Sequence, residues 1–201
     1  VKLVIQNNVL YAYSNNGQLF LYDEILDKFI MKADLRQLLN NNYFLVHEML
    51  FDENGFLWIA SSSGLYHYKD DKCKLISAES VDCKSLVKLD KNHLCYFYLN
   101  KIVRINTDTY KTNIIYKDSK LKTIHLSELF YDNEKSRLWI GTVSEGLYYF
   151  DLRNKILNKA PISNFPGQPI QAIEVNNKES ILVGIDGQGV WELNRDGSRV
   201  L

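Results

Sequence analysis

The sequence predicts an all-β protein built as a β-propeller, with blades of four antiparallel strands. Two observations favour this fold. First, "GFLWIASSSGLYHYK" (residues 55–69) and "SRLWIGTVSEGLYYFD" (residues 136–151) place a large aromatic residue, a small-residue corner, a glycine and a second aromatic run in the same order. Second, weaker copies start near Val9, His93 and Ile181, so the phrase returns about every 43 residues, which is the period of a four-stranded blade.

The first two strands of each blade follow from the apolar pattern. An alternating apolar run opens each copy at residues 2–5, 46–51, 86–89, 127–131 and 170–175, and a turn rich in Asn and Asp follows it. The second strand reads "LYAY", "LWIA", "LCYF", "LWIG" or "ILVG". Apolar residues at consecutive positions indicate a strand that is covered on both faces, as a blade between two neighbours is.

A glycine corner leads to the third strand at Gly17, Gly64, Gly146 and Gly189. The third copy has Lys101 there, so its corner must differ or carry strain. The fourth, outer runs lie at 28–32, 73–77, 112–116, 155–159 and 198–201, and their lysines suit an exposed sheet edge. Only residues 33–42 look helical, with Asp34 as the N-cap.

We therefore predict one partial propeller over residues 1–201, with blades at 1–40, 41–82, 83–123, 124–165 and 166–201. Trp58 and Trp139 are expected to act as wedges between adjacent blades, with their indole N–H groups bonded to backbone carbonyls. The alternative is that these two residues, or Trp191 on a third strand, stack against a sugar. The structural positions of the repeat are Trp58, Gly64, Trp139, Gly141, Gly146, Gly184, Gly189 and Trp191.

Composition excludes several classes of partner. The 24 Lys and Arg residues balance the 24 Asp and Glu residues, so we expect no nucleic-acid binding by this segment. No apolar stretch has the length of a membrane span, and we expect a soluble chain. It begins at Val1 without an initiator Met, which suggests a piece of a longer protein.

The sequence contains no P-loop, GxSxG, HExxH or EF-hand motif, and we expect no catalytic residue, metal or cofactor. Cys73, Cys83 and Cys95 have no metal-ligand spacing. They are expected to be half-buried apolar residues, although Cys73 and Cys83 could pair in an oxidising compartment. The "DGQG" run at 186–189 is expected to be a tight turn rather than a calcium or phosphate site.

The candidate ligand contacts are polar residues on the corners between second and third strands. Loops at one end of a propeller are the natural binding positions, and hydroxyl, amide and carboxylate groups there suit an oligosaccharide. The alternative is that they are ordinary solvated turns and that another rim or domain binds the ligand. These candidates are Asn16, Ser62, Ser144, Glu145, Asp186 and Gln188.

"LWIGTVSEGLYYFD" and "LWIASSSGLYHYK" resemble the two-component regulator propeller repeat. "VGIDGQGVWELNRDG" is similar to the end of such repeats in periplasmic sensors of Bacteroidetes hybrid two-component systems. The resemblance implies a periplasmic sensor region of a hybrid histidine kinase that responds to glycan breakdown products. It also implies seven blades per ring, so we favour an incomplete arc over a closed five-bladed ring.

An arc leaves two apolar blade faces open, so a homodimer or end-to-end association is expected, beside contacts with the remaining blades of the parent. Two alternatives remain. One is a carbohydrate-active propeller enzyme, a hydrolase or lyase, although this sequence has no Asp-box motif. The other is a propeller scaffold that binds proteins, although the sequence lacks the WD and kelch signatures.

Overall fold

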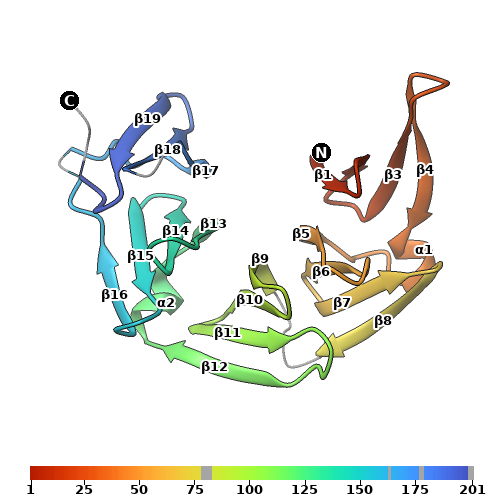
Figure 1. Ribbon diagram of the computed structural model, residues 1–201, viewed down its shortest axis with the longest axis horizontal. Helices are drawn as coiled ribbons and strands as arrows, with labels where there is room; N and C mark the ends of the chain where they lie inside the picture. The colour runs from red at the N-terminus through yellow and green to blue at the C-terminus, as the bar shows by residue number, and fades with distance from the viewer. Residues whose placement is uncertain (78–82, 163, 177–178, 199–201) are drawn as a thin grey trace. The chain divides into compact units, whose positions relative to one another are not determined.

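The computed structural model describes residues 1–77, 83–162, 164–176 and 179–198. In this part of the chain nineteen strands form five antiparallel sheets, which confirms the predicted propeller blades (Figure 1). The strands of each sheet are consecutive in the sequence, so every blade is a simple meander. The chain divides into two compact units, Val1–Asn113 and Ile114–Leu201, which are described separately.

The first unit contains the first three blades. Each one opens with the alternating run that the sequence predicted and ends in an outer strand, and the first two blades pass through a glycine corner, at Gly17 and Gly64. The boundary between the units falls within the last strand, β12. The strands are β1 (Lys2–Gln6), β2 (Val9–Tyr13), β3 (Gln18–Asp23), β4 (Lys28–Asp34), β5 (Val46–Phe51), β6 (Leu57–Ser61), β7 (Gly64–Lys69), β8 (Lys72–Ser77), β9 (Cys83–Asp90), β10 (His93–Tyr98), β11 (Lys101–Asn106) and β12 (Thr112–Lys117).

The second unit contains the last two blades. Its four-stranded sheet comprises β13 (Leu126–Asp132), β14 (Arg137–Thr142), β15 (Leu147–Asp151) and β16 (Ile156–Lys159). The sheet that follows has three described strands, β17 (Ile170–Val175), β18 (Ser180–Ile185) and β19 (Gly189–Asn194). The outer run predicted at 198–201 lies almost entirely outside the described residues.

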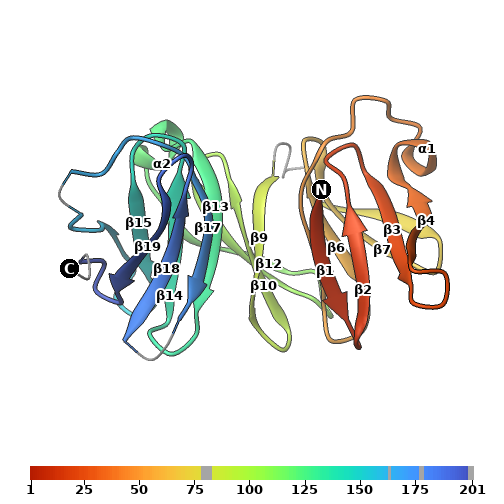
Figure 2. The same cartoon turned by 90° about the horizontal axis from the view of Figure 1, so that it is seen from above.

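The predicted helix is confirmed as α1 (Leu35–Leu39). The Asp34 carboxylate caps it by accepting hydrogen bonds from the backbone N–H groups of Arg36 and Gln37. Figure 2 shows α1 at the end of the first sheet opposite the β3–β4 turn. A second short helix, α2 (Lys120–Thr123), was not predicted, and the expectation that only 33–42 is helical was wrong. Neither helix in the described chain has the length and apolarity needed to cross a membrane.

The core of the first unit lies between its sheets. Leu57 and Ile59 of β6 pack with Tyr13 and Leu19 of the first sheet. The intervening residue Trp58 faces the opposite way and packs, with Ala60, against the third sheet. This alternation explains why β6 is apolar at every position, as the sequence predicted for a blade covered on both faces.

The second unit repeats this packing. Trp139 of β14 is fully buried and packs against Ile173, Ile181 and Val183 of the following sheet. Both tryptophans therefore lie between adjacent blades, as predicted. Trp191 is half-buried at the same interface, where its ring contacts Phe165 edge-on at a centroid distance of 6.4 Å.

The β6–β7 corner confirms the need for glycine at a tight position. Gly64 has φ +131°, and a Cβ atom there would lie 2.7 Å from the Ser77 carbonyl oxygen. In the third blade, where Lys101 replaces glycine, the corner is a turn in which Leu99 takes a left-handed φ of 49°. The sequence left two outcomes open, a different corner or a strained one, and this corner differs from the glycine corners and also places a leucine in a strained conformation.

Candidate functional site

The predicted binding corners of the first unit are ordered by hydrogen bonds to the chain that leads into β5. Asn15 O accepts from Val46 N at 2.8 Å, and Ser62 N donates to Leu45 O at 2.9 Å. The Ser62 hydroxyl in turn accepts from Leu45 N at 3.1 Å. The β2–β3 and β6–β7 corners are therefore both hydrogen-bonded to the same short segment at the start of β5.

Asn16 is exposed at the tip of the β2–β3 corner. Its Oδ1 atom accepts from Nη2 of Arg36 on α1 at 3.1 Å, which restrains the side chain. Ser62 is half-buried and holds its own corner, so its hydroxyl is already engaged. Of these two predicted contacts, Asn16 is the one presented to solvent.

The second unit presents the remaining candidates in the same way. Ser144, Glu145, Asp186 and Gln188 are all exposed. The backbone beneath them is fixed, because Glu145 N donates to Thr142 Oγ1 at 2.9 Å and Gln188 N donates to Ile185 O at 3.0 Å. Polar tips on a rigid base can donate to and accept from a ligand without first being ordered.

One backbone hydrogen bond recurs at the base of three corners. The residue after the second strand donates to the residue before the first strand of the same blade, at distances of 2.8–2.9 Å. The pairs are Ser62 with Leu45, Val143 with His125, and Asp186 with Pro169. In the described chain no hydrogen bond joins the side chains of the six predicted contacts to one another.

The prediction for the indole N–H groups was wrong. Trp58 Nε1 donates to Oδ2 of the buried carboxylate of Asp52 at 2.7 Å, not to a backbone carbonyl. Trp139 Nε1 is buried and has no hydrogen-bond partner among the described residues. Both rings are fully buried, so neither offers a face to a sugar.

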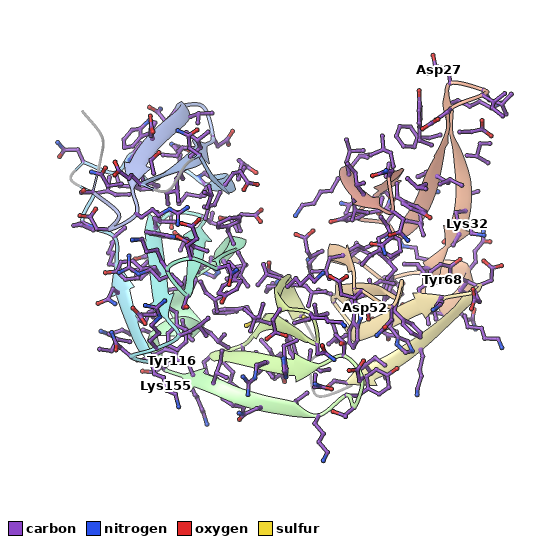
Figure 3. All side chains as sticks on the ribbon, viewed as in Figure 1. Asp27, Lys32, Asp52, Tyr68, Tyr116 and Lys155 are labelled. Carbon is purple, nitrogen blue, oxygen red and sulfur yellow. The ribbon has the colours of Figure 1, made fainter. Side chains whose placement is uncertain are left out.

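A hollow of about 450 Å³ lies at the other end of the second sheet, away from the β6–β7 corner. The ring of His67 forms its buried part, and Phe56 stacks on that ring at a centroid distance of 4.9 Å. Figure 3 labels two nearby residues, Asp52, which precedes β6, and Tyr68 of β7. The hollow is lined by Phe56, His67, Lys69, Asp70, Lys72 and Lys74.

This hollow was not predicted, because lysines on an outer strand are also typical of an exposed sheet edge. The register of the β7–β8 hairpin does indicate a concentration of basic residues at this end of the sheet. Lys69 pairs directly with Lys72, and His67 pairs with Lys74, so basic groups face each other across the β7–β8 hairpin. Like charges at directly opposed positions are unfavourable, so the Lys69–Lys72 pair in a short hairpin indicates a site for an anion.

A second hollow, of about 320 Å³, lies in the second unit and is more polar. Arg195 is 4% exposed, and its Nη1 donates to Asp132 Oδ1 at 3.1 Å and to Glu134 Oε2 at 3.0 Å. Because its charge is neutralised by two carboxylates, Arg195 acts as an internal tie between β13 and the end of β19.

The described residues contain no group of three His, Cys, Asp or Glu side chains arranged to hold a metal ion. All three cysteines are free thiols, so Cys73 and Cys83 do not form the disulfide that the sequence left open. Burial raises the pKa of the Cys73 thiol to about 12, which keeps it protonated and unreactive at neutral pH.

No protein-family model and no curated protein matches the sequence. Solved structures, in contrast, do match this chain. The extracellular domain of a hybrid two-component system from B. thetaiotaomicron is 18% identical, with a TM-score of 0.71 over 94% of this chain and 26% of that chain. The extracellular domain of another such system from the same organism is 13% identical, with a TM-score of 0.62 over 93% of this chain and 26% of that chain.

Solved structures of other kinds of protein match as well. A calcium-binding protein, regucalcin, from Agrobacterium tumefaciens is 17% identical, with a TM-score of 0.66 over 90% of this chain and 66% of that chain. The present chain spans about a quarter of the length of the hybrid-system domains it matches. At these identities the likeness establishes architecture, and the chain has the β-propeller fold that is found in the extracellular domains of hybrid two-component systems.

Proposed function

We propose that this chain is part of the periplasmic ligand-sensing region of a hybrid two-component sensor kinase and that it responds to oligosaccharides derived from glycans. The observation that carries the proposal is the match, over nearly the whole chain, to extracellular domains of two hybrid two-component systems. The kinase region and further propeller blades would belong to other parts of the parent protein. We assign no catalytic residue to this segment.

The exposed corners support a binding role. Glu145 and Gln188 project polar groups from turns whose backbone is already hydrogen-bonded, so a sugar would not have to order the loop. Hydroxyl groups of a sugar can bond such side chains directly or through water. A ligand would then transmit a signal only through a difference in its affinity for the two signalling arrangements of the parent.

The test is isothermal titration calorimetry of this chain against a panel of oligosaccharides. One glycan fragment should bind, and Glu145→Gln or Gln188→Ala should weaken that binding about tenfold or more. Asn158→Ala is the control, because Asn158 lies half-buried on β16 and not on a corner. Binding that no corner variant affects would exclude the corners as the site. Product analysis after incubation distinguishes sensing from catalysis, because an enzyme would shorten the oligosaccharide.

We further propose that the chain associates with a second copy through the open face of the first sheet. Leu3 and Met31 lie on one face by strand register, and they are 62% and 56% exposed. Ile5 lies on the same face and is 67% exposed. The opposite face of this sheet already packs on the second blade, so a blade from another copy would continue the same stacking.

Sedimentation at increasing concentration tests this association. Wild type should form dimers, and Ile5→Lys should shift the equilibrium towards monomer by about tenfold or more, because a charge would be buried at the contact. Ile25→Lys is the control, since Ile25 is 94% exposed in the β3–β4 turn. A wild-type chain that stays monomeric at the highest concentration contradicts the proposal.

A further inference from the structure

Three lysines border the hollow at the β7–β8 hairpin. Lys69, Lys72 and Lys74 line it together with one carboxylate, that of Asp70. No ion pair is formed by any of these three lysines within the described residues. The nearby acidic side chains are engaged elsewhere, because Asp52 accepts from Trp58 and Asp71 accepts from the Tyr68 hydroxyl.

Strand register forces this concentration of charge. Lys69 lies directly opposite Lys72, and His67 lies directly opposite Lys74. Such an arrangement lowers the stability of a hairpin unless an anion lies between the cations. A hairpin that keeps two lysines directly opposite each other and a third lysine beside them, while Asp52 and Asp71 are bonded to other groups, is suited to an anionic ligand.

Aromatic rings hold two of the ammonium groups in place. Lys69 Nζ lies 4.4 Å from the centroid of the Phe56 ring and donates to Asn54 O at 2.8 Å. Lys74 Nζ lies 5.5 Å from the centroid of the Tyr110 ring. Cation–π contacts of this kind restrain long side chains, so part of the entropy cost of binding is already met.

The inner part of the hollow is apolar and flat. The His67 ring is 7% exposed, stacks on Phe56 with an interplanar angle of 14° and contacts Tyr110 edge-on. Burial and the charge of Lys74 lower the pKa of His67, against the opposing effect of Asp52, so the ring is neutral at pH 7. An apolar ring face beneath cationic groups matches a ligand that is itself a ring with an acidic substituent.

We propose that this hollow binds a six-membered ring that carries a carboxylate. The carboxylate lies between Lys72 and Lys74, and the ring packs towards Phe56 and His67. Two kinds of molecule share this chemistry, hexuronic acids and aromatic carboxylic acids. The site lies at the end of the sheet away from the predicted corners, so it is separate from the oligosaccharide contacts proposed above.

Calorimetric titration of the whole chain with galacturonate, benzoate, galactose and acetate tests the proposal. At least one of the two ring carboxylates should bind about tenfold more tightly than both galactose, which lacks the charge, and acetate, which lacks the ring. The stronger of the two ring carboxylates identifies the source. If neither binds more tightly than acetate, or if galactose binds equally well, the proposal is overturned.

Two variants locate the site. The double variant K72Q/K74Q should weaken binding about tenfold or more, and raising the salt concentration should weaken wild-type binding, because the contact is ionic. The matched control K28Q/K155Q removes two exposed lysines, one at the start of β4 and one in the β15–β16 turn, and should change the affinity less than about twofold. Equal losses in the two double variants would overturn the proposal. All four lysines are on the surface or at the hollow's edge, so circular dichroism should report a folded chain for both variants.

Discussion

The indole nitrogen of Trp58 lies 2.7 Å from Oδ2 of Asp52, and both side chains are buried. The other carboxylate oxygen accepts from the backbone N–H groups of Asn54 and Phe56. One carboxylate therefore joins the tryptophan wedge between two blades to the turn that begins its strand. In the fourth blade Asp132 instead binds Arg195, and the Trp139 indole is left without this acceptor.

Asp52→Asn should lower the free energy of unfolding by about 2 kcal/mol, because an amide cannot accept from all three donors as a carboxylate does. Urea unfolding followed by tryptophan fluorescence measures this. Asp90→Asn is the matched control. Asp90 also ends a first strand, but its side chain is 58% exposed, so its replacement should cost less than about 1 kcal/mol. Equal losses in the two variants would contradict the role given to Asp52.

Gly141→Ala should destabilise the protein while Gly184→Ala should not. The two glycines occupy the same position of their second strands, but a Cβ on Gly141 would lie 2.8 Å from Ile170 Cγ2, whereas a Cβ on Gly184 would lie 3.5 Å from Ala172 Cβ. Overpacking of this kind costs about 1–3 kcal/mol, and an ordinary contact costs less than about 0.5 kcal/mol. Thermal unfolding of the two variants side by side tests the difference, and equal melting temperatures would refute it.

Leu99→Asn should stabilise the protein by about 0.5–1 kcal/mol, because asparagine tolerates the left-handed backbone that Leu99 takes at φ 49°. Leu99 is 54% exposed, so little apolar burial is lost with it. Denaturant unfolding reports the gain. Leu38→Asn, at a 46% exposed position in α1, is the control and should not stabilise. A decrease in stability for Leu99→Asn would show that the turn is not strained.

The free energy of unfolding should fall as pH drops from 7.5 to 5.5, in part because of His67. Burial and Lys74 lower the pKa of His67 in the folded state below its ordinary value of 6.5, and Asp52 only partly opposes them. The unfolded chain therefore takes up a proton on this residue before the folded chain does, which favours unfolding below pH 6.5. His67→Phe should flatten this decrease, and His125→Gln, at an exposed position, should leave it unchanged. Equal slopes in wild type and His67→Phe would contradict the shift.

Asp132→Ala should cost more stability than Glu134→Ala, although both carboxylates accept from Arg195. Asp132 is 1% exposed and Glu134 is 57% exposed. Removing the buried partner leaves the guanidinium largely uncompensated, at a cost of about 3–5 kcal/mol, while the exposed partner contributes about 1 kcal/mol or less. Chemical unfolding of both variants would contradict this order if Glu134→Ala were the more damaging change.

The blade architecture could be predicted because it depends on residue patterns within short segments of the sequence. A strand such as "LWIA" is apolar at every position only if both faces are covered, and the two cores that Leu57 and Trp58 join confirm this. The cap at Asp34 and the strain at the third corner also depend on neighbouring residues alone. These features need no knowledge of contacts between distant segments.

The partners of buried polar atoms could not be predicted in this way. The sequence does not show whether the Trp58 indole N–H donates to a backbone carbonyl or to the Asp52 carboxylate, because that choice depends on how the side chains pack. Beside the hollow, the His67 ring of the second blade contacts Tyr110, which lies between β11 and β12 of the third blade. The lysines of the hollow look, in the sequence, like any solvated outer edge. The predicted corner contacts remain predictions until binding is measured.

A backbone hydrogen bond closes the base of three corners, as between Ser62 and Leu45. This arrangement has an evolutionary consequence. Residues at the tips can be exchanged, or extra ones inserted, while the strands beneath keep their register. A lineage of such proteins could diversify its recognition through a handful of tip substitutions, and the same property would make these turns convenient points for grafting peptides of chosen affinity.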